Sequence, residues 1–172
     1  MFPTRAEETD EHALSPDAAQ ERLQRVFPCS EPYQVVHTNL YKTHQRVAAK
    51  FRVGRVFLAG DSAHVNNPIG GLGLNCGIHD AMELVDTLHQ VAGKQAEDAL
   101  LDRYERRRRP INIEFVQQTT IANKKRLEER DPEVRKSKQD ELRRTAEDPK
   151  QHKQFLMRAS LLESVRKAEQ IH

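Results

Sequence analysis

Residues 60–81 read GDSAHVNNPIGGLGLNCGIHDA and contain five of the seven glycines in this chain of 172 residues. Four consecutive apolar residues, 56–59, precede this stretch. Such a run between turn residues predicts a strand buried on both faces, as in a parallel sheet. After the stretch, apolar residues recur at helical spacing from 81 to 92, which predicts a helix that begins near Leu74, packs one face against the sheet and ends at Gly93. The stretch therefore connects a strand to a helix in an α/β fold.

The connecting loop carries groups suited to a ligand. Asp61 follows the strand, at the sheet edge where open α/β folds bind ligands, and its carboxylate can accept a hydrogen bond from a sugar or polyol hydroxyl. Gly70, Gly71, Gly73 and Gly77 lack a Cβ, so the backbone can approach a flat ligand closely. The first amides of the following helix have no intrahelical acceptor and carry the positive end of the helix dipole. We expect an electron-rich ligand.

Two phosphate-binding motifs do not match this loop. A P-loop requires Gly-Lys-Ser/Thr, which is absent from the stretch. The dinucleotide motif GxGxxG, read from Gly71, would need a glycine where Cys76 stands. A plain strand-to-helix turn without a ligand remains the alternative interpretation.

Residues 54–84, GRVFLAGDSAHVNNPIGGLGLNCGIHDAMEL, resemble the Gly-Asp motif of the FAD-dependent aromatic hydroxylases, the p-hydroxybenzoate hydroxylase-like group A flavin monooxygenases. The later segment LLDRYERRRRP, residues 100–110, is also similar to that family. The resemblance implies an α/β fold that is the C-terminal portion of an FAD-binding Rossmann-like monooxygenase domain, with few strands followed by long helices. The implied domains are 1–50, the end of a substrate-domain region with a helix and strands; 51–130, the C-terminal part of the FAD-binding domain; and 131–172, a helical C-terminal extension.

The resemblance also implies roles for individual residues. Asp61 corresponds to the carboxylate that hydrogen-bonds the ribityl chain of FAD, and the Pro68 loop borders the isoalloxazine ring. The amides of Leu74 and Asn75 face the N1 and C2-carbonyl side of the flavin. For His64 we expect a structural role rather than that of a base, and we assign no catalytic residue. The implied cofactor-binding set is Asp61, Pro68, Gly70, Gly71, Gly73, Leu74 and Asn75.

The activity implied by the resemblance is hydroxylation of an aromatic or related ring through a flavin C4a-hydroperoxide. NADH or NADPH reduces the FAD, and oxygen and the small aromatic molecule are the substrates. No GxGxxG precedes residue 60. We therefore expect a C-terminal fragment that is inactive alone and needs a complementary N-terminal half or a homo-oligomer. The alternatives are a non-enzymatic remnant, a helical protein-interaction module, or another flavin oxidoreductase of the same ancestry, such as an epoxidase or halogenase.

Local signals predict the remaining elements. Ser15-Pro16 predicts the start of a helix, and YQVVHTNLY at residues 33–41 predicts a strand. Pro110 is expected to interrupt or begin a helical segment. Asp131-Pro132 and Asp148-Pro149 predict breaks between helices.

Composition and charge limit the classes of function. Lys and Arg number 28 against 26 Asp and Glu, so the net charge of +2 gives no general attraction to nucleic acid or anionic membranes. We expect the basic run at residues 106–109 to be a solvated helix face. Two cysteines without a CxxC pair and no apolar run of membrane-spanning length favour a cytoplasmic protein. The histidine spacing predicts no metal site.

Overall fold

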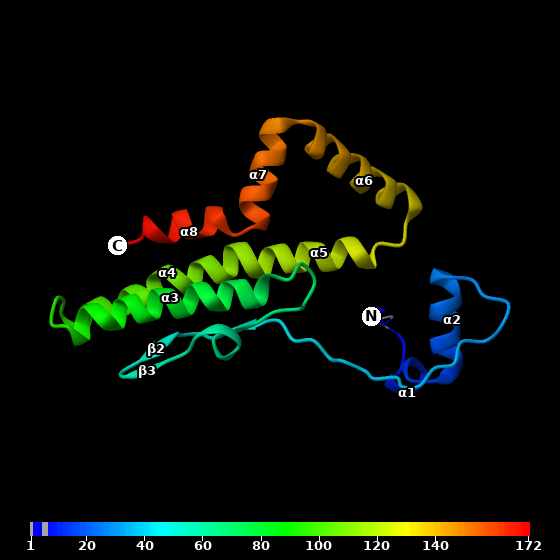
Figure 1. The fold of residues 1–172 in the computed structure, drawn as a ribbon, viewed down its shortest axis with the longest axis horizontal. Coiled ribbons are helices and arrows are strands. Elements are labelled where there is room, and N and C mark those ends of the chain that lie inside the picture. Colours follow the sequence, from blue (N-terminus) through cyan, green and yellow to red (C-terminus); the bar gives the residue numbers. More distant parts are fainter. Residues whose placement is uncertain (1, 5–6) are drawn as a thin grey trace. The chain divides into compact units, whose positions relative to one another are not determined.

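The computed structural model describes residues 2–4 and 7–172, and the chain forms two compact units, residues 1–42 and 43–172 (Figure 1). The first unit contains α1 (Asp10–Ala13) and α2 (Pro16–Val26). The predicted start of α2 is confirmed: the Ser15 hydroxyl accepts a hydrogen bond from the Ala18 amide at 3.2 Å. This bond satisfies an amide that has no acceptor within the helix.

The predicted strand at residues 33–41 is wrong, because this segment has no regular secondary structure. A strand needs a neighbouring strand for its backbone hydrogen bonds. Here the Gln20 side chain takes that place at Tyr33: the Tyr33 amide donates to Gln20 Oε1 at 2.9 Å, and Gln20 Nε2 donates to the Tyr33 carbonyl at 2.6 Å. The β-branched residues of the segment are mostly exposed.

The strands of the second unit form short antiparallel pairs. β1 (Arg46–Val47) pairs with β4 (His64–Val65), and β2 (Arg52–Val53) pairs with β3 (Val56–Phe57). The turn between β2 and β3 contains Gly54, whose φ is 60°. The expectation that residues 56–59 form a parallel strand buried on both faces is wrong for the described residues. Val56 is 67% exposed, and β3 has only the antiparallel neighbour β2 there.

Long helices follow the strands. α3 (Leu72–Ala92) begins two residues before the predicted position and ends at Gly93, as predicted. After η2 (Asp98–Leu101), α4 (Asp102–Ile111), the π-helical η3 (Asn112–Gln117) and α5 (Gln118–Glu128) continue one into the next. Figure 1 shows α4 beside α3, and the two helices are in contact.

Pro110 does not interrupt or begin a segment, so that expectation is wrong. It lies inside α4, and the helix continues through it with a change to π-helical hydrogen bonding two residues later. Proline has no N–H, so one hydrogen bond of α4 is missing at this position.

The last three helices are α6 (Pro132–Glu147), α7 (Pro149–Ala159) and α8 (Leu162–Glu169). The predicted breaks are confirmed. The carboxylates of Asp131 and Asp148 each accept two amide hydrogen bonds from the first turn of the helix that follows, α6 and α7 respectively. A capping carboxylate followed by proline is a local start signal.

Two apolar clusters form the core of the second unit. One joins α3, α4, η3 and the C-terminal helices through Leu72, Cys76, Ile111, Phe115, Val116, Leu161 and Ala168. The other is centred on Phe51, Ala63 and Tyr104, under the β2–β3 hairpin. The loop at residues 60–71 contributes Ala63 to the second cluster and is followed directly by Leu72 of the first, so buried side chains hold it at both places. In the described part of the chain, no helix has the length and hydropathy of a membrane span.

Candidate functional site

The loop after β3 presents the Asp61 side chain to solvent. Gly60–Ser62 forms a short 3₁₀ turn, η1, in which Gly60 has a φ of 58°. Asp61 is exposed, and no described residue hydrogen-bonds its carboxylate. η1 packs against α3, where a Cβ built on Gly77 would lie 3.3 Å from Gly60 Cα. The Asp61 carboxylate is therefore accessible to a ligand, and the turn that bears it is held close to α3.

Left-handed glycines shape the second half of the loop. Gly70 and Gly71 have φ values of 112° and 65°, a region that favours glycine. The Gly71 amide donates to the Pro68 carbonyl at 3.1 Å, which closes a turn with Pro68 exposed. Gly73 and Gly77, by contrast, are helical residues of α3 without positive φ. The expected freedom of backbone conformation is used at Gly70 and Gly71 alone among these four.

The N-terminus of α3 carries no side-chain cap. Its N-cap residue is Gly71, and no side chain of the described residues accepts from the first turn. Since the N-cap carbonyl accepts the first intrahelical bond, the amides of Leu72, Gly73 and Leu74 have no intrahelical acceptor. Leu74 and Asn75 are exposed, and the Asn75 side chain donates to the Gly71 carbonyl at 3.3 Å. This uncapped end attracts an electron-rich group.

The buried side chain of Asn67 restrains the loop. Asn67 is buried, its Nδ2 donates to Gln45 Oε1 at 2.7 Å, and its Oδ1 accepts from the Ile69 amide at 3.1 Å. Gln45 Nε2 in turn donates to Thr120 Oγ1 at 2.6 Å. A side-chain amide thus fixes this part of the loop.

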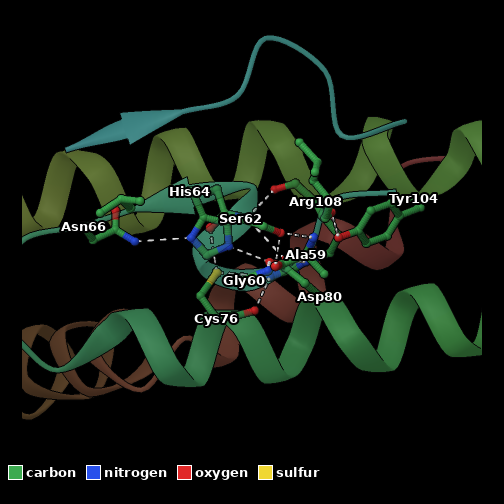
Figure 2. A network of polar contacts seen from close by, with 12 residues as sticks. Ala59, Gly60, Ser62, His64, Asn66, Cys76, Asp80, Tyr104 and Arg108 are labelled. Atoms are coloured by element: carbon green, nitrogen blue, oxygen red, sulfur yellow. Dashed lines mark hydrogen bonds and ion pairs between the residues drawn. The ribbon is translucent and has the colours of Figure 1, made fainter. Parts of the chain in front are cut away.

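The buried carboxylate of Asp80, on α3, anchors the start of the loop (Figure 2). It accepts a hydrogen bond from the Gly60 amide at 3.1 Å and lies 2.5 Å from His64 Nε2. Its other oxygen accepts from Arg108 Nε at 2.7 Å and from Asn112 Nδ2 at 3.3 Å. The loop, α3, α4 and η3 therefore meet at one fully buried charge.

The surroundings of Asp80 set its protonation state. Burial by itself raises the pKa of the carboxyl, but the hydrogen bond from His64 and the charge and hydrogen bond of Arg108 outweigh it and hold the pKa below its usual value. Asp80 is therefore the anionic partner of Arg108, which is itself buried. His64 is buried beside Asp80, whereas Asp61 is exposed.

Cys76 lies next to this network. Its Sγ is 3.2 Å from Arg108 Nη2 and donates to Asn112 Oδ1 at 3.0 Å. Burial raises the pKa of the thiol to about 12, although the charge of Arg108 acts in the opposite direction. Cys76 is therefore a neutral, buried side chain.

Sequence reasoning missed the convergence on Asp80. The expectation of a solvated face at residues 106–109 is wrong for Arg108, which is 2% exposed, and Arg107 is paired with Glu83 at 3.1 Å. The two partners Asp80 and Arg108 are 28 residues apart, so no local pattern relates them. The spacing of one helix face was a signal for the burial of Arg108, because Tyr104, Arg108 and Ile111 lie on the same, buried side of α4.

Three atoms capable of binding a metal also meet here, which the histidine spacing did not predict. One ligand atom each from His64, Cys76 and Asp80 lie within 4.8 Å of one another. The Arg108 guanidinium occupies the same neighbourhood, and its positive charge opposes a cation. The geometry therefore favours an ion-paired structural cluster.

The sequence profile of the family described as FAD binding domain matches residues 2–119. The para-nitrophenol 4-monooxygenase of Pseudomonas sp. (strain WBC-3) is 45% identical over 118 residues, which cover 67% of this chain and 29% of that protein. The solved structure of p-nitrophenol 4-monooxygenase PnpA from Pseudomonas putida DLL-E4 superposes with a TM-score of 0.74 at 35% identity, covering 90% of this chain and 40% of that one. Aklavinone-11 hydroxylase, solved as a ternary complex with FAD and aklavinone, gives a TM-score of 0.59 at 31% identity over 69% of this chain and 22% of that one.

These matches confirm the resemblance stated from the Gly-Asp motif and the predicted α/β fold. The chain spans about a third of the relatives' length, between 22% and 40% of the three proteins above. The profile match extends over more than half of the chain and includes the whole loop from Gly60 to Asn75. The chain therefore belongs to the FAD-binding domain family, among relatives that are monooxygenases and hydroxylases.

Proposed function

We propose that this chain supplies the flavin-facing part of an FAD site in a monooxygenase that hydroxylates an aromatic ring. The observation that carries the proposal is the Asp61 carboxylate: it is exposed and has no hydrogen-bond partner among the described residues, yet the turn that bears it is fixed by a buried ionic network. A carboxylate held in place but left unpaired is suited to accept hydrogen bonds from a polyol such as the ribityl chain.

The residues around Asp61 fit the other parts of the cofactor. The amides at the start of α3 are uncapped, and reduced flavin carries negative charge at its N1 and C2-carbonyl side, which a helix N-terminus stabilises. A Cβ on Gly71 would meet nothing within 4 Å, so this glycine leaves the loop surface open near exposed Pro68, whereas a Cβ on Gly70 would lie 2.8 Å from the Asn123 side chain. The proposed cofactor-binding set is that inferred from the sequence: Asp61, Pro68, Gly70, Gly71, Gly73, Leu74 and Asn75.

The chemistry divides between the cofactor and the protein. Bound FAD supplies the redox chemistry that activates oxygen, with NADH or NADPH as the reductant. Asp61 holds the polyol chain and so sets the position of the ring. The amides of Leu72, Gly73 and Leu74 offer positive potential where electron density gathers. The Asp80 network keeps this arrangement fixed without contacting the cofactor.

Flavin binding tests the proposal. The chain is co-expressed with the part of the Pseudomonas sp. para-nitrophenol 4-monooxygenase that lies outside the region of similarity, and FAD retained after gel filtration is measured by its visible absorbance. We expect little flavin on the chain alone and retention by the complemented protein. Asp61→Asn should weaken FAD binding about tenfold or more, the loss expected for one hydrogen bond to a charged group. Asp98→Asn, also at an exposed carboxylate, is the matched control.

Turnover distinguishes a monooxygenase from the other interpretations. The complemented protein should oxidise NADH or NADPH in the presence of oxygen and p-nitrophenol, and mass spectrometry should detect an oxygenated product. A non-enzymatic remnant or helical interaction module would show neither flavin binding nor NAD(P)H oxidation. Flavin binding that is unchanged by Asp61→Asn would contradict the site assignment.

A further inference from the structure

A pocket of about 300 Å³ is lined by the segment that leads into β2 and by α4. None of the proposed cofactor-binding residues lines it. Cations outnumber carboxylates among its charged lining residues, which are Lys50, Arg52, Asp102, Glu105, Arg106 and Arg109. The pocket is therefore a concave surface with an excess of positive charge.

Both carboxylates of the pocket have partners within the chain. Asp102 Oδ1 accepts a hydrogen bond from Arg52 Nη1 at 2.7 Å. Glu105 Oε2 accepts from the amides of Phe51 and Arg52 at 2.7 and 3.0 Å. Arg52 also donates its Nε to the Gly54 carbonyl at 2.9 Å. These bonds hold β2 against α4, so the two acids and Arg52 form the wall of the pocket.

The other three cations of the pocket are not neutralised. Among the described residues, no carboxylate forms an ion pair with Lys50, Arg106 or Arg109. Arg106 Nε donates to the His172 carbonyl at 3.2 Å, and Arg109 Nε donates to the Ala48 carbonyl at 3.0 Å. These bonds orient both guanidinium groups and leave their Nη atoms available to a ligand.

The pocket also accounts for part of the basic run at residues 106–109. Arg108 is buried against Asp80, and Arg107 pairs with Glu83, whereas Arg106 and Arg109 both line the pocket. Residues three apart lie on the same face of a helix, and like charges at such a spacing repel each other. A concave surface lined by one sign of charge attracts ions of the other sign. An anion in the pocket would offset this repulsion.

We infer that the pocket binds a small ligand through a diphosphate group, with Lys50, Arg106 and Arg109 as the binding side chains. A guanidinium group can donate two parallel hydrogen bonds to phosphoryl oxygens, and a lysine ammonium adds a compact charge. The three cations come from two segments of the chain. They suit an anion that presents several charged oxygens in different directions, as a diphosphate does and a single planar carboxylate does not. The volume is at the lower end for ligand sites, which fits a small molecule.

Titration calorimetry on the full chain tests the inference. Inorganic pyrophosphate is added in a phosphate-free buffer of low ionic strength, because salt screens exposed charges. We expect saturable binding of one pyrophosphate per chain. Adenosine diphosphate should also bind and adenosine should not, since the contacts are to the phosphoryl groups. Tighter binding of adenosine diphosphate than of pyrophosphate would identify the ligand as a nucleotide. Absence of saturable binding by both would overturn the inference, and equal binding of citrate would refute the phosphoryl class.

Substitutions locate the binding site. Lys50→Gln and Arg106→Gln should each weaken pyrophosphate binding about tenfold, the loss expected for a hydrogen bond between charged groups. Lys125→Gln and Arg126→Gln on α5 are the matched controls, because these side chains are exposed and lie outside the pocket. Circular dichroism should show all four variants folded. Equal losses in all four would mean that pyrophosphate responds to the net charge of the chain, which would refute the pocket.

A substitution of opposite sign separates binding from a structural role. Asp102 is a carboxylate at the pocket with 61% of its side chain exposed, so it repels an anion there. Asp102→Asn should tighten pyrophosphate binding about threefold or more, as expected for removing a nearby like charge. Weaker binding by this variant would contradict the assignment.

The pocket is independent of the proposed flavin site. Asp61→Asn should leave pyrophosphate binding unchanged, and Lys50→Gln should leave FAD retention by the complemented protein unchanged. A loss of pyrophosphate binding in Asp61→Asn would place the anion at the glycine-rich loop and overturn the inference.

Discussion

Asp80 is a buried carboxylate whose four hydrogen-bonding neighbours come from four segments of the chain. His64, Arg108, Asn112 and the Gly60 amide all contact it. Removing one partner of a buried ion pair leaves the other charge without compensation, which costs more than the intact pair contributes. Loss of the Asp80 charge would leave the buried Arg108 guanidinium without a compensating negative charge.

We therefore expect Asp80→Asn to lower the free energy of unfolding by about 3–5 kcal/mol. The measurement is urea unfolding followed by circular dichroism. Asp86→Asn, on the same helix but exposed, is the matched control and should change stability by at most about 0.5 kcal/mol, as surface substitutions do. Equal effects of the two substitutions would show that the pair with Arg108 is of little consequence.

The same carboxyl gives a pH dependence with a defined sign. The pKa of Asp80 is lower in the folded chain than in the unfolded one, so the unfolded state binds more protons on acidification. Its stabilisation is complete above the ordinary carboxyl pKa of about 4 and is lost as the pH falls through the lower folded value. The stability difference between the unsubstituted chain and Asp80→Asn should therefore be constant near neutral pH and shrink below about pH 4. A difference that grows on acidification would contradict this sign.

The two cysteines should differ in reactivity. Cys29 is exposed, whereas Cys76 is buried and its thiol pKa is raised to about 12 by burial. Thiolate is the reactive form, so a disulfide reagent at mildly alkaline pH should modify Cys29 quickly and Cys76 only on unfolding. The expected absorbance change corresponds to one thiol in the native chain and two in denaturant. Rapid modification of both thiols in the native chain would show that the cluster around Asp80 opens readily.

At the scale of elements, the sequence predicted what depends on neighbours along the chain. The starts of α2, α6 and α7 were foreseen because a capping side chain and a proline at the next position act locally. The end of α3 at Gly93 was predicted from the glycine itself, which is again a local signal. The candidate cofactor-binding residues of the loop, such as Asp61, were also inferred from a motif that is contiguous in sequence.

The predictions that were wrong depend on interactions between segments that are distant in sequence. Residues 33–41 have β-branched and aromatic residues, but no partner strand pairs with them. Asp80 and Arg108 have ordinary surface character in sequence, and only packing of α3 on α4 buries them together. For α3 the periodicity identified the apolar side, but it could not reveal that this side is exposed in the chain.

Two glycines of α3 allow the contact between this helix and η1 to be tested. A Cβ on Gly73 would meet nothing within 4 Å, whereas a Cβ on Gly77 would lie 3.3 Å from Gly60 Cα. Gly60 cannot retreat easily, because its φ is 58° and its amide is bonded to Asp80. Gly73→Ala should therefore raise stability by about 0.4–1 kcal/mol through the unfolded state. Gly77→Ala should lower it by about 1–3 kcal/mol through overpacking.

Urea midpoints of the two alanine variants provide this comparison. The Gly77→Ala variant should also loosen the loop, which faster modification of Cys76 by a thiol reagent would report. Equal midpoints for the two variants would indicate that η1 moves away from α3 at little cost, and the loop would then not be fixed as described.

At the scale of the whole chain, the described contacts divide it after Lys42. Residues 34–45 have no helix or strand, and residues 41–44 are exposed. Both apolar clusters and the Asp80 network lie in the second unit. Proteases cleave exposed, unstructured segments first, since these can adapt to the active site without unfolding. Limited trypsin digestion should therefore cut after Lys42, and mass spectrometry should detect fragments 1–42 and 43–172.

The larger fragment should keep the properties of the intact second unit. Because its core is made by residues after 43, it should retain helical circular dichroism and the protection of Cys76 from thiol reagents. The basic residues of α6, such as Arg135 and Arg144, are exposed but helical, so they should be cut later than Lys42. First cleavage within α6, or loss of Cys76 protection once Lys42 is cut, would mean that the first 42 residues stabilise the loop-bearing unit.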